Sequence, residues 1–185
     1  IDFPVSDMIP ILAGQFDLPS PSLEAVLKCE HKYWSRVEQR MAVPEHTPQF
    51  NRFDPFAEDP LDQIQLPYPF WIKPVKSFSS YLGFRIENEA DFHRAIEEIR
   101  PNIQRLGDAF NAILRHARLP AEIAGVDGNW CIAEEIVDGH QCTLEGWVQK
   151  GVAEVYGTVD SVREANRSSF ARYQYPSKLP EDVRE

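Results

Sequence analysis

Apolar residues recur every three or four positions in three long segments of the chain, which is the spacing of an amphipathic helix. The first segment follows Ser22, a candidate N-cap, and Pro44 stops it. The second begins at Asn88, which has Asp91 three residues further on, and Pro101 is expected to interrupt it. We therefore predict helices over residues 23–43, 88–100 and 103–118.

Shorter apolar runs, bounded by proline, glycine and polar residues, indicate β-strands. The run YPFWIKPV (residues 68–75) is followed by SFSSYLGFRI (77–86), in which a small-residue loop returns into a second strand, so the two predict a β-hairpin. Six prolines between residues 44 and 70 exclude a long helix there. Further strands are expected at 47–53, 130–137, 141–149 and 152–162, the last three in antiparallel order, with one or two helical turns at 59–64.

The order of helix, hairpin, helices and strands predicts an α+β fold rather than a βαβ repeat. Residues 1–22 are too few for a domain and are expected to be the tail of a preceding unit and a connector. The polar segment 166–185 gives no assignable element. The chain begins at Ile1 rather than Met, so we expect its N-terminus to be a boundary set within a longer sequence.

Composition narrows the classes of function. The formal net charge of −10 disfavours a nucleic-acid partner, which needs a basic surface. No apolar run approaches the roughly 18 residues of a membrane span and no leader is recognisable, so no membrane association and a cytoplasmic location are expected. The five histidines form no metal-binding or catalytic spacing. Three cysteines without metal spacing are expected to be free thiols, namely Cys29, Cys131 and Cys142.

Lys73 ends an apolar run and precedes Pro74 and a serine-rich loop. A lysine that emerges from a buried strand is well placed to meet a phosphate, because its ammonium is a point charge on a flexible stem. The loop adds backbone amides and the hydroxyls of Ser77, Ser79 and Ser80 as donors. The alternative is a solvated strand end with a polar loop, and no GxxxxGK[ST] or GxGxxG motif decides between the two.

Two adjacent carboxylates, Glu134 and Glu135, lie between apolar residues in AEEIVDGH. Neighbouring residues of a strand point to opposite faces, so one of the two is expected to face inward and to need a partner. The strand and the turn after it would offer backbone groups to a planar heterocycle. The alternative is an ordinary strand and turn with exposed acids. A further basic residue, Lys32, lies on the first predicted helix, where a lone lysine is usually a solvated charge.

Three segments in this order resemble the ATP-grasp superfamily, whose members include D-alanine–D-alanine ligase and biotin carboxylase. They are HKYWSRVEQRMAVPEHTPQF, YPFWIKPVKSFSSYLGF and IAEEIVDGHQCTLEGWV, with an amphipathic helix between the last two. They match a helix that carries a lysine ahead of a Val-Pro turn, a P-x-x-K-P strand leading into a Gly/Ser-rich loop, and an E-x-x-x-x-G segment. The resemblance covers roughly residues 20–160.

The resemblance implies an ATP-binding site. Lys32 and Lys73 match the two lysines that face phosphate in the family. Ser77, Ser79 and Ser80 match the flexible loop that closes over the phosphates. The remaining matches are Glu134, Ile136 and Val137, where the family receives adenine through backbone groups, and Gln141, where many members place a ribose-binding Glu.

Two departures from the family pattern bear on the chemistry. Phe78 and Leu82 stand where glycines are common, and glycine is the residue that most easily allows a backbone to approach a phosphate. Nothing after Asp160 resembles the Glu…Glu-x-Asn pattern that coordinates Mg²⁺ in the family, so the metal ligands are expected beyond the end of this chain. The resemblance implies a connecting helix at 23–43, a small lid subdomain at 44–132 and a partial start of the larger subdomain at 133–185.

The function that the resemblance implies is the ATP-binding portion of a ligase. Such a ligase activates a small carboxylate as an acyl-phosphate, which an amine or another nucleophile then attacks. This chain alone is expected to be inactive, and surfaces exposed by truncation would allow it to form an oligomer. One alternative is a degenerate module that binds nucleotide or a partner protein without catalysis. Another is an unrelated α+β scaffold in which Lys73 and Glu134 are solvated and far apart.

Overall fold

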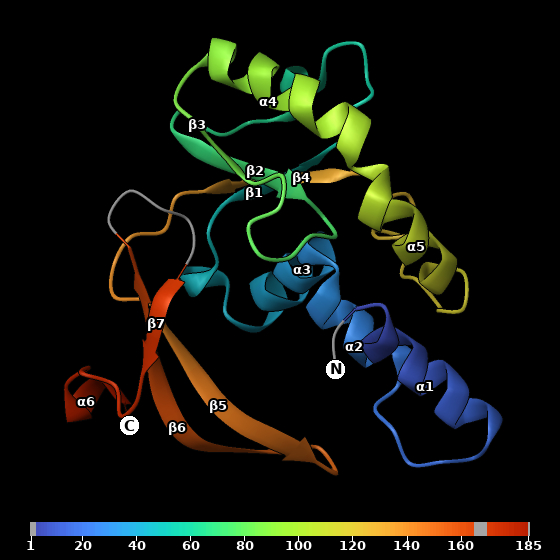
Figure 1. The fold of residues 1–185 in the computed structure, drawn as a ribbon, viewed down its shortest axis with the longest axis vertical. Coiled ribbons are helices and arrows are strands. Elements are labelled where there is room, and N and C mark those ends of the chain that lie inside the picture. The colour runs from blue at the N-terminus through green and yellow to red at the C-terminus, as the bar shows by residue number, and fades with distance from the viewer. Residues whose placement is uncertain (1–2, 165–169, 185) are drawn as a thin grey trace. The chain divides into compact units, whose positions relative to one another are not determined.

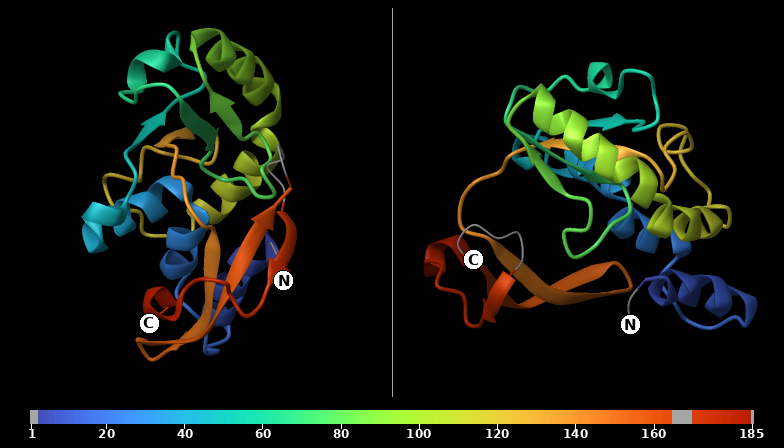
Figure 2. Two further views of the ribbon diagram at one scale, coloured as in Figure 1. Left: turned by 90° about the vertical axis from the view of Figure 1, so that its left-hand side faces the viewer. Right: turned by 45° about the horizontal axis from the view of Figure 1, so that its top comes forward.

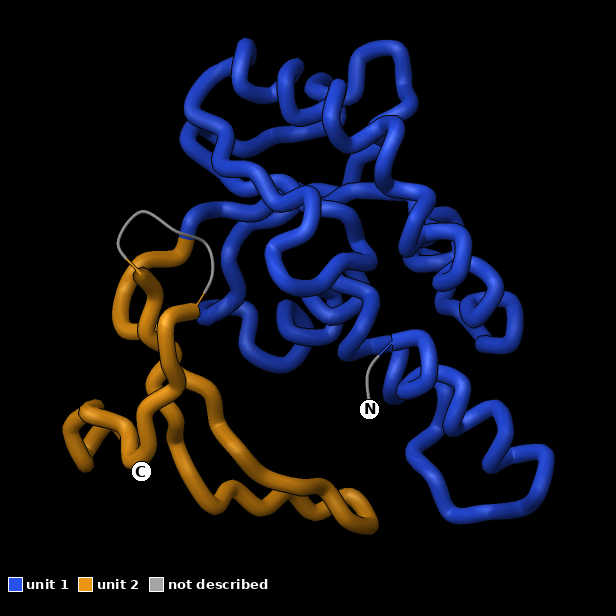
Figure 3. The backbone as a smooth tube through the Cα atoms, in the orientation of Figure 1, with its two compact units in different colours: residues 1–136 blue, residues 137–185 orange. Residues whose placement is uncertain are grey.

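The computed structural model describes residues 3–164 and 170–184 (Figure 1). The chain forms two compact units, residues 1–136 and 137–185 (Figure 3). Each unit contains an antiparallel sheet, and helices accompany both sheets. The predicted α+β class is therefore confirmed.

The sheet of the first unit has four strands in the order β1-β4-β2-β3, and every neighbouring pair is antiparallel. β2 and β3 form the hairpin that the sequence predicts. The prediction that β4 pairs with the strands that follow it is wrong, since β4 lies between β1 and β2. Its first four residues are buried, which suits a central strand covered on both faces. The strands are β1 (Phe50–Phe53), β2 (Phe70–Pro74), β3 (Phe84–Ile86) and β4 (Cys131–Glu135).

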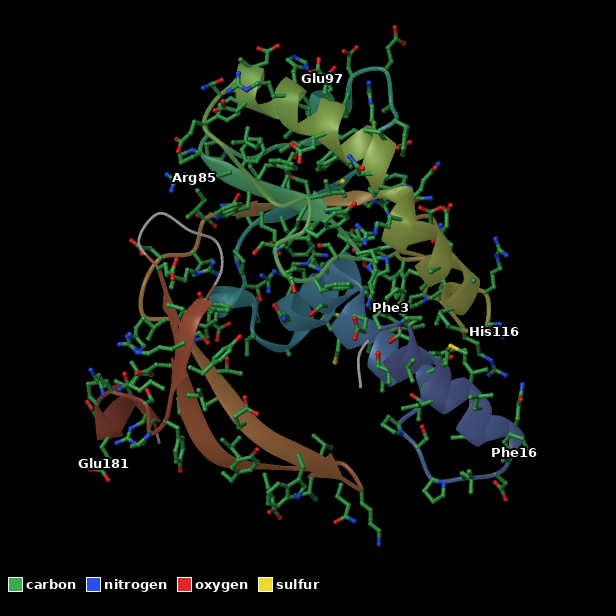
Figure 4. The ribbon with its side chains drawn as sticks, viewed as in Figure 1. Phe3, Phe16, Arg85, Glu97, His116 and Glu181 are labelled. Atoms are coloured by element: carbon green, nitrogen blue, oxygen red, sulfur yellow. The ribbon has the colours of Figure 1, made fainter. Side chains whose placement is uncertain are left out.

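Helices cover both faces of this sheet (Figures 1 and 2). On one face, α4 (Glu89–Asn102) packs its apolar stripe against Phe70 and Ile72 of β2, while Glu97 lies on the outward side of the helix (Figure 4). On the other face, Ile132 of β4 packs against the remaining core helices. These are α2 (Leu23–Glu30), α3 (Lys32–Ala42) and α5 (Gln104–Leu114), and they contribute Leu27, Trp34, Val37 and Phe110 among others.

Helix ends follow local side-chain capping. Ser22 Oγ accepts the Ala25 amide at 3.2 Å, and Asn88 Oδ1 accepts the Asp91 amide at 3.0 Å, so both predicted N-caps are confirmed. The predicted helix over 23–43 is divided at His31 into α2 and α3. Pro101 does not end α4, which continues through it by one residue before α5 begins.

Three shorter helical segments complete the first unit. Residues 5–15, within the segment expected to be a tail and connector, form a helix, α1 (Val5–Gln15), which continues through Pro10. The turns predicted at 59–64 are present as a 3-10 helix, Pro60–Gln63. A second 3-10 helix, Pro44–His46, follows α3.

The second unit is a three-stranded antiparallel sheet with the order β5-β6-β7, followed by the short helix α6. The buried carboxylate of Asp160 on β6 ties the following segment to the sheet, because it accepts hydrogen bonds from His140, the Ser177 hydroxyl and the Lys178 amide. No element was predicted in this C-terminal segment, of which residues 165–169 lie outside the described residues. The elements are β5 (Cys142–Gln149), β6 (Val152–Arg163), β7 (Phe170–Gln174) and α6 (Glu181–Arg184).

Within the described ranges, 3–164 and 170–184, no helix is long and apolar enough to cross a membrane.

Candidate functional site

Lys73 and Glu134 lie on the same face of the four-stranded sheet. Lys73 of β2 is opposite Ile132 of β4, and Glu134 is opposite Trp71, so the two charged residues are diagonal neighbours across the paired strands. The Lys73 ammonium forms an ion pair with Oε2 of Glu134. The two residues that the sequence singled out independently are therefore in contact, which excludes the interpretation in which both are solvated and far apart.

Glu134 is the inward-facing member of the Glu134–Glu135 pair, as the alternation predicts. Its side chain is only 6% exposed, whereas Glu135 is exposed. Its second oxygen, Oε1, accepts a hydrogen bond from Arg36 Nε of α3 at 2.6 Å. Burial by itself would raise the pKa of Glu134, but the ion pairs with Lys73 and Arg36 outweigh burial and lower it. Glu134 is thus a buried carboxylate that bridges two cations from different elements.

Lys32 begins α3 and faces the loop that follows β2. Its backbone amide donates to the Val75 carbonyl at 2.9 Å, and its ammonium donates to the Ser77 carbonyl. Burial lowers the pKa of Lys32 to about 8, and the nearby positive charges of Lys73 and Lys76 add to this shift. The structure therefore brings together the two lysines that the sequence predicts to face phosphate.

His31 caps the start of α3, the helix whose first residue is Lys32. Its ring is fully buried; Nδ1 accepts the Trp34 amide at 3.2 Å, and Nε2 lies 2.9 Å from the Val126 carbonyl. The ring thereby caps α3 and separates it from α2. The role of His31 was not predicted, since the histidines show no metal-binding or catalytic spacing and the preferred cap residues are Ser, Thr, Asp and Asn.

Two further charged residues were missed, namely Lys76 within the loop that follows β2 and Glu30 on α2. Lys76 is buried and pairs with Glu30 of α2, and its ammonium lies 3.9 Å from the Phe3 ring centroid and 5.1 Å from that of Phe110. The aromatic contacts and the ion pair together offset the cost of burying this charge. Lys76 is thus an anchor of the loop, and its position three residues after Lys73 was the only sequence signal for it.

The loop between β2 and β3 has a backbone that glycine would normally supply. Ser79, Ser80 and Leu82 have φ angles of 50°, 59° and 54°, in the left-handed region that ordinary residues rarely adopt. Leu82 is buried in the core beneath α4, and this packing holds the loop in place. Ser79 and Ser80 are exposed at its tip. Of the two non-glycine residues noted in the sequence, Leu82 therefore occupies a left-handed backbone position.

The other predicted residues are distributed as follows. Ser77 meets Lys32 through its backbone carbonyl rather than its hydroxyl. Ile136 directly follows the end of β4 and is half-buried. Val137 and Gln141 belong to the second unit, where both are exposed and Gln141 Oε1 accepts a hydrogen bond from Arg163 at 3.1 Å. The proposed contacts of these residues with a nucleotide stay predictions.

Arg36 was also missed, and one signal for it was available. It lies four residues after Lys32, so the two share one face of α3. Arg36 and Lys73 pair with the carboxylate of Glu134, and Lys32 lies close enough for Lys73, Lys76, Glu30 and Glu134 to act on its charge. In a chain with a net charge of −10, a local excess of positive charge is suited to an anion with several negative oxygens, because such an anion can satisfy the lysines without displacing Glu134 from Arg36.

A cavity of about 320 Å³ lies elsewhere in the first unit. It is lined by Gln49, Glu135, Ile136 and the segment 66–69. Glu135 lines the cavity, and its side chain points to the opposite face of β4 from that of Glu134. The cavity therefore lies on the other side of the strand from the Lys73–Glu134 ion pair. None of Lys32, Arg36, Lys73 and Glu134 lines this cavity. Across the part of the chain that the structure describes, no group of three or more His, Cys, Asp or Glu side chains is arranged to hold a metal ion.

Comparison with known proteins identifies the fold. No protein-family model and no curated protein sequence matches the chain. An L-amino acid ligase from Bacillus licheniformis matches with a TM-score of 0.70 at 20% identity, over 96% of this chain and 38% of that one. D-alanyl-alanine synthetase A from Vibrio cholerae matches with a TM-score of 0.65 at 12% identity, over 98% of this chain and 51% of that one.

A third structure, of carboxyaminoimidazole ribonucleotide synthase from Aspergillus clavatus complexed with ATP, matches with a TM-score of 0.54 at 16% identity. It covers 83% of this chain and 34% of that one. These proteins are ATP-grasp ligases, and the present chain has the fold of part of such a ligase. The chain spans between about a third and a half of the length of the structures it matches.

Proposed function

We propose that this chain is the ATP-binding portion of an ATP-grasp ligase. The observation that carries the proposal is the convergence of Lys32 from α3 and Lys73 from β2 around Glu134, within a fold that ATP-grasp ligases share. The two lysines would bind phosphate oxygens of the nucleotide, and Ser79 and Ser80 would close over them from the loop. The adenine contacts at Glu134, Ile136 and Val137 and the ribose contact at Gln141 come from the family resemblance.

The residues present fit the phosphates of ATP by charge. Lys32 and Lys73 are both partly exposed, and burial of the Lys32 amine is the main cause of its lowered pKa. Arg36 is occupied with Glu134 and Gln39. The site thus offers two adaptable point charges for a polyphosphate, and a fixed arginine that holds the carboxylate between them.

In the complete ligase, the terminal phosphoryl group of ATP is transferred to a small carboxylate, which gives ADP and an acyl-phosphate. An amine or another nucleophile then attacks the acyl carbon and phosphate leaves. The lysines of this chain contribute position and charge stabilisation to the transferring group. Mg²⁺ would offset the charge on the phosphates, and its ligands are expected beyond residue 185. The chain alone is therefore expected to bind ATP and to catalyse no ligation.

Titration calorimetry of the chain with ATP in the presence of Mg²⁺ tests the proposal. Binding by the wild type is expected to weaken at least tenfold in Lys73→Gln and in Lys32→Gln, since each loses a charge-assisted contact worth about 1.5–3 kcal/mol. Lys28→Gln is the matched control, because Lys28 lies on α2 in a partly exposed ion pair with Glu38. Equal affinities for all four proteins, or no binding by the wild type, would refute the ATP site.

The alternative is a module that binds nucleotide or a partner protein without catalysis. It is favoured by the loop, where Phe78 and Leu82 stand in place of glycines and the left-handed positions carry side chains. A longer chain that includes the metal ligands would distinguish the two. Release of ADP in the presence of Mg²⁺ and one member of a panel of carboxylates identifies a ligase. ATP binding with no ADP release across the panel identifies the non-catalytic module.

A further inference from the structure

The carboxylate of Glu134 has two cationic partners, one on each oxygen. Arg36 donates to Oε1 from α3, and Lys73 pairs with Oε2 from β2. The two cations are about equally accessible, with 26% and 30% of their side chains exposed, while Glu134 is 6% exposed. A carboxylate this buried requires a partner at all times, because an unpaired charge in such a place is strongly destabilising.

The two cations differ in how firmly they are held. Arg36 also donates through Nη1 to Gln39 Oε1, and Gln39 in turn donates to Ser35 Oγ at 3.2 Å, so the guanidinium is fixed within α3. The planar guanidinium of an arginine is rigid, so it can donate to two acceptors without changing its geometry. Lys73 lies near the end of β2, next to the loop, and its flexible stem allows the ammonium to turn away from Glu134.

We infer that Arg36 is a positioning residue that keeps Glu134 paired and thereby frees Lys73 to exchange its carboxylate partner for a phosphate of the nucleotide. The inference rests on the proposed function, since it takes ATP as the ligand that Lys73 turns to. Without Arg36, the departure of Lys73 would leave a buried carboxylate unpaired, so Lys73 would stay on Glu134. Glu134 therefore competes with the ligand for Lys73, and Arg36 sets the strength of that competition.

Two substitutions separate this role from a merely structural one. Arg36→Gln removes the second cation, and ATP affinity is expected to fall about tenfold, the equivalent of roughly one pKa unit of interaction. Glu134→Gln removes the competing charge, and the double variant Arg36→Gln/Glu134→Gln is expected to regain wild-type ATP affinity or exceed it. If Arg36 only stabilised the fold, the second substitution would make the defect worse. Arg40→Gln is the matched control, because Arg40 lies one turn further along α3 in an exposed pair with Glu122.

The competition is also measurable without nucleotide, by acetylating the ligand-free chain with limiting reagent and quantifying modified Lys73 by mass spectrometry. Labelling of Lys73 is expected to fall about threefold to tenfold in Arg36→Gln, where Glu134 holds it alone, and to rise above wild type in Glu134→Gln and in the double variant. Labelling of Lys28 is the internal reference. If Arg36→Gln does not fold, Glu134→Gln still tests the inference. An unchanged rate of Lys73 acetylation in Glu134→Gln would show that Glu134 does not compete for Lys73.

The two measurements separate the two proposals. If the wild type binds no ATP, the proposed function fails, and the labelling pattern still decides whether Arg36 and Lys73 share Glu134. If the wild type binds ATP but Arg36→Gln binds it equally well, or the double variant does not recover, the ATP site stands and the role of Arg36 is refuted.

Discussion

The Nδ1 atom of His31 lies 3.2 Å from the Trp34 amide nitrogen and accepts its hydrogen bond, so a buried imidazole begins the helix that carries Lys32 and Arg36. An acceptor at Nδ1 must be unprotonated, and the proton is then on Nε2, which donates to the Val126 carbonyl. Burial lowers the pKa of His31, in agreement with a neutral ring. The start of α3 therefore depends on an imidazole ring that has to remain neutral.

Replacing His31 by Ala is expected to destabilise the first unit by roughly 2–4 kcal/mol, from the lost cap and the unpaired Val126 carbonyl. Urea unfolding measures this, and His116→Ala, at an exposed position, is the control with a change of less than about 0.5 kcal/mol. Because the folded pKa of His31 lies below the unfolded value of about 6.5, its contribution is complete above that pH and is lost as the pH falls further. His31→Asn, which keeps a cap acceptor, is expected to lose this acid sensitivity; an unchanged pH profile would contradict the assignment.

Binding of polyphosphate is expected to weaken as the pH rises through about 8, because Lys32 loses its proton there. Burial is the main cause of its lowered pKa, and the surrounding charges are those of Lys73, Lys76, Glu30 and Glu134. A bound anion would move the titration to higher pH, since it favours the charged amine. Lys32→Arg remains charged throughout, so tripolyphosphate affinity measured between pH 7 and 9.5 should be flat in that variant and fall severalfold in the wild type.

The same lowered pKa has a consequence for folding. The unfolded lysine binds its proton up to about 10.4, whereas the folded one releases it near 8, so between these values the unfolded state binds more protons and stability rises with pH. Lys32→Met lacks this ionisable group. Its stability relative to wild type is therefore expected to be greatest below pH 8 and to decrease above it, which urea midpoints at pH 7 and pH 10 would show.

Local patterns predicted the parts of the site but not how they meet. The strand ending at Lys73, the inward-facing carboxylate at Glu134 and the caps at Ser22 and Asn88 follow from the residues next to them. The contact between Lys73 and Glu134 depends on β4 lying between β1 and β2, and strand order is set by packing between residues far apart in sequence. Neither the periodicity nor the segments that carry the family resemblance predicted that order.

Arg36 and His31 were missed for different physical reasons. An arginine four residues after a lysine is a common surface pattern, and its inward role appears only once the helix is placed against β4. A histidine is rarely the cap of a helix, so local preference argued against it. In the second unit, β7 was missed because its five residues, FARYQ, do not alternate between apolar and polar, and most of them are exposed in the folded chain.

The loop after β2 provides a prediction about strain. Ser80 adopts a φ of 59°, at a cost of about 1–2 kcal/mol for a residue with a Cβ. Glycine removes that cost but adds about 0.5–1 kcal/mol of unfolded-state entropy. Ser80→Gly is therefore expected to leave stability unchanged or raise it by up to about 1 kcal/mol. Ser80→Ala, which keeps the Cβ, should not show the gain, and thermal unfolding compares them.

Leu82 has the same backbone conformation and the opposite expected response. Its side chain is buried beneath α4, so Leu82→Gly relieves the backbone but removes core packing worth about 2–5 kcal/mol. A net loss of at least about 1 kcal/mol is expected. If Leu82→Gly were as stable as wild type, packing would not be what holds the loop, and the loop would have to be held instead by Lys76 and its ion pair with Glu30.

The second unit gives a test that involves no nucleotide. Hydrogen bonds from Ser177, His140 and the Lys178 amide lower the pKa of Asp160 to about 2, so the carboxylate holds the segment after β7 against β6 down to strongly acidic pH. The contribution is complete above the unfolded pKa of about 3.9 and is lost as the pH falls towards 2. In Asp160→Ala the Lys178 amide loses its acceptor, and its hydrogen exchange is expected to accelerate at neutral pH. Asp182→Ala, in the exposed helix α6, is the control. Equal hydrogen exchange rates of the Lys178 amide in the two variants would show that Asp160 does not hold this segment.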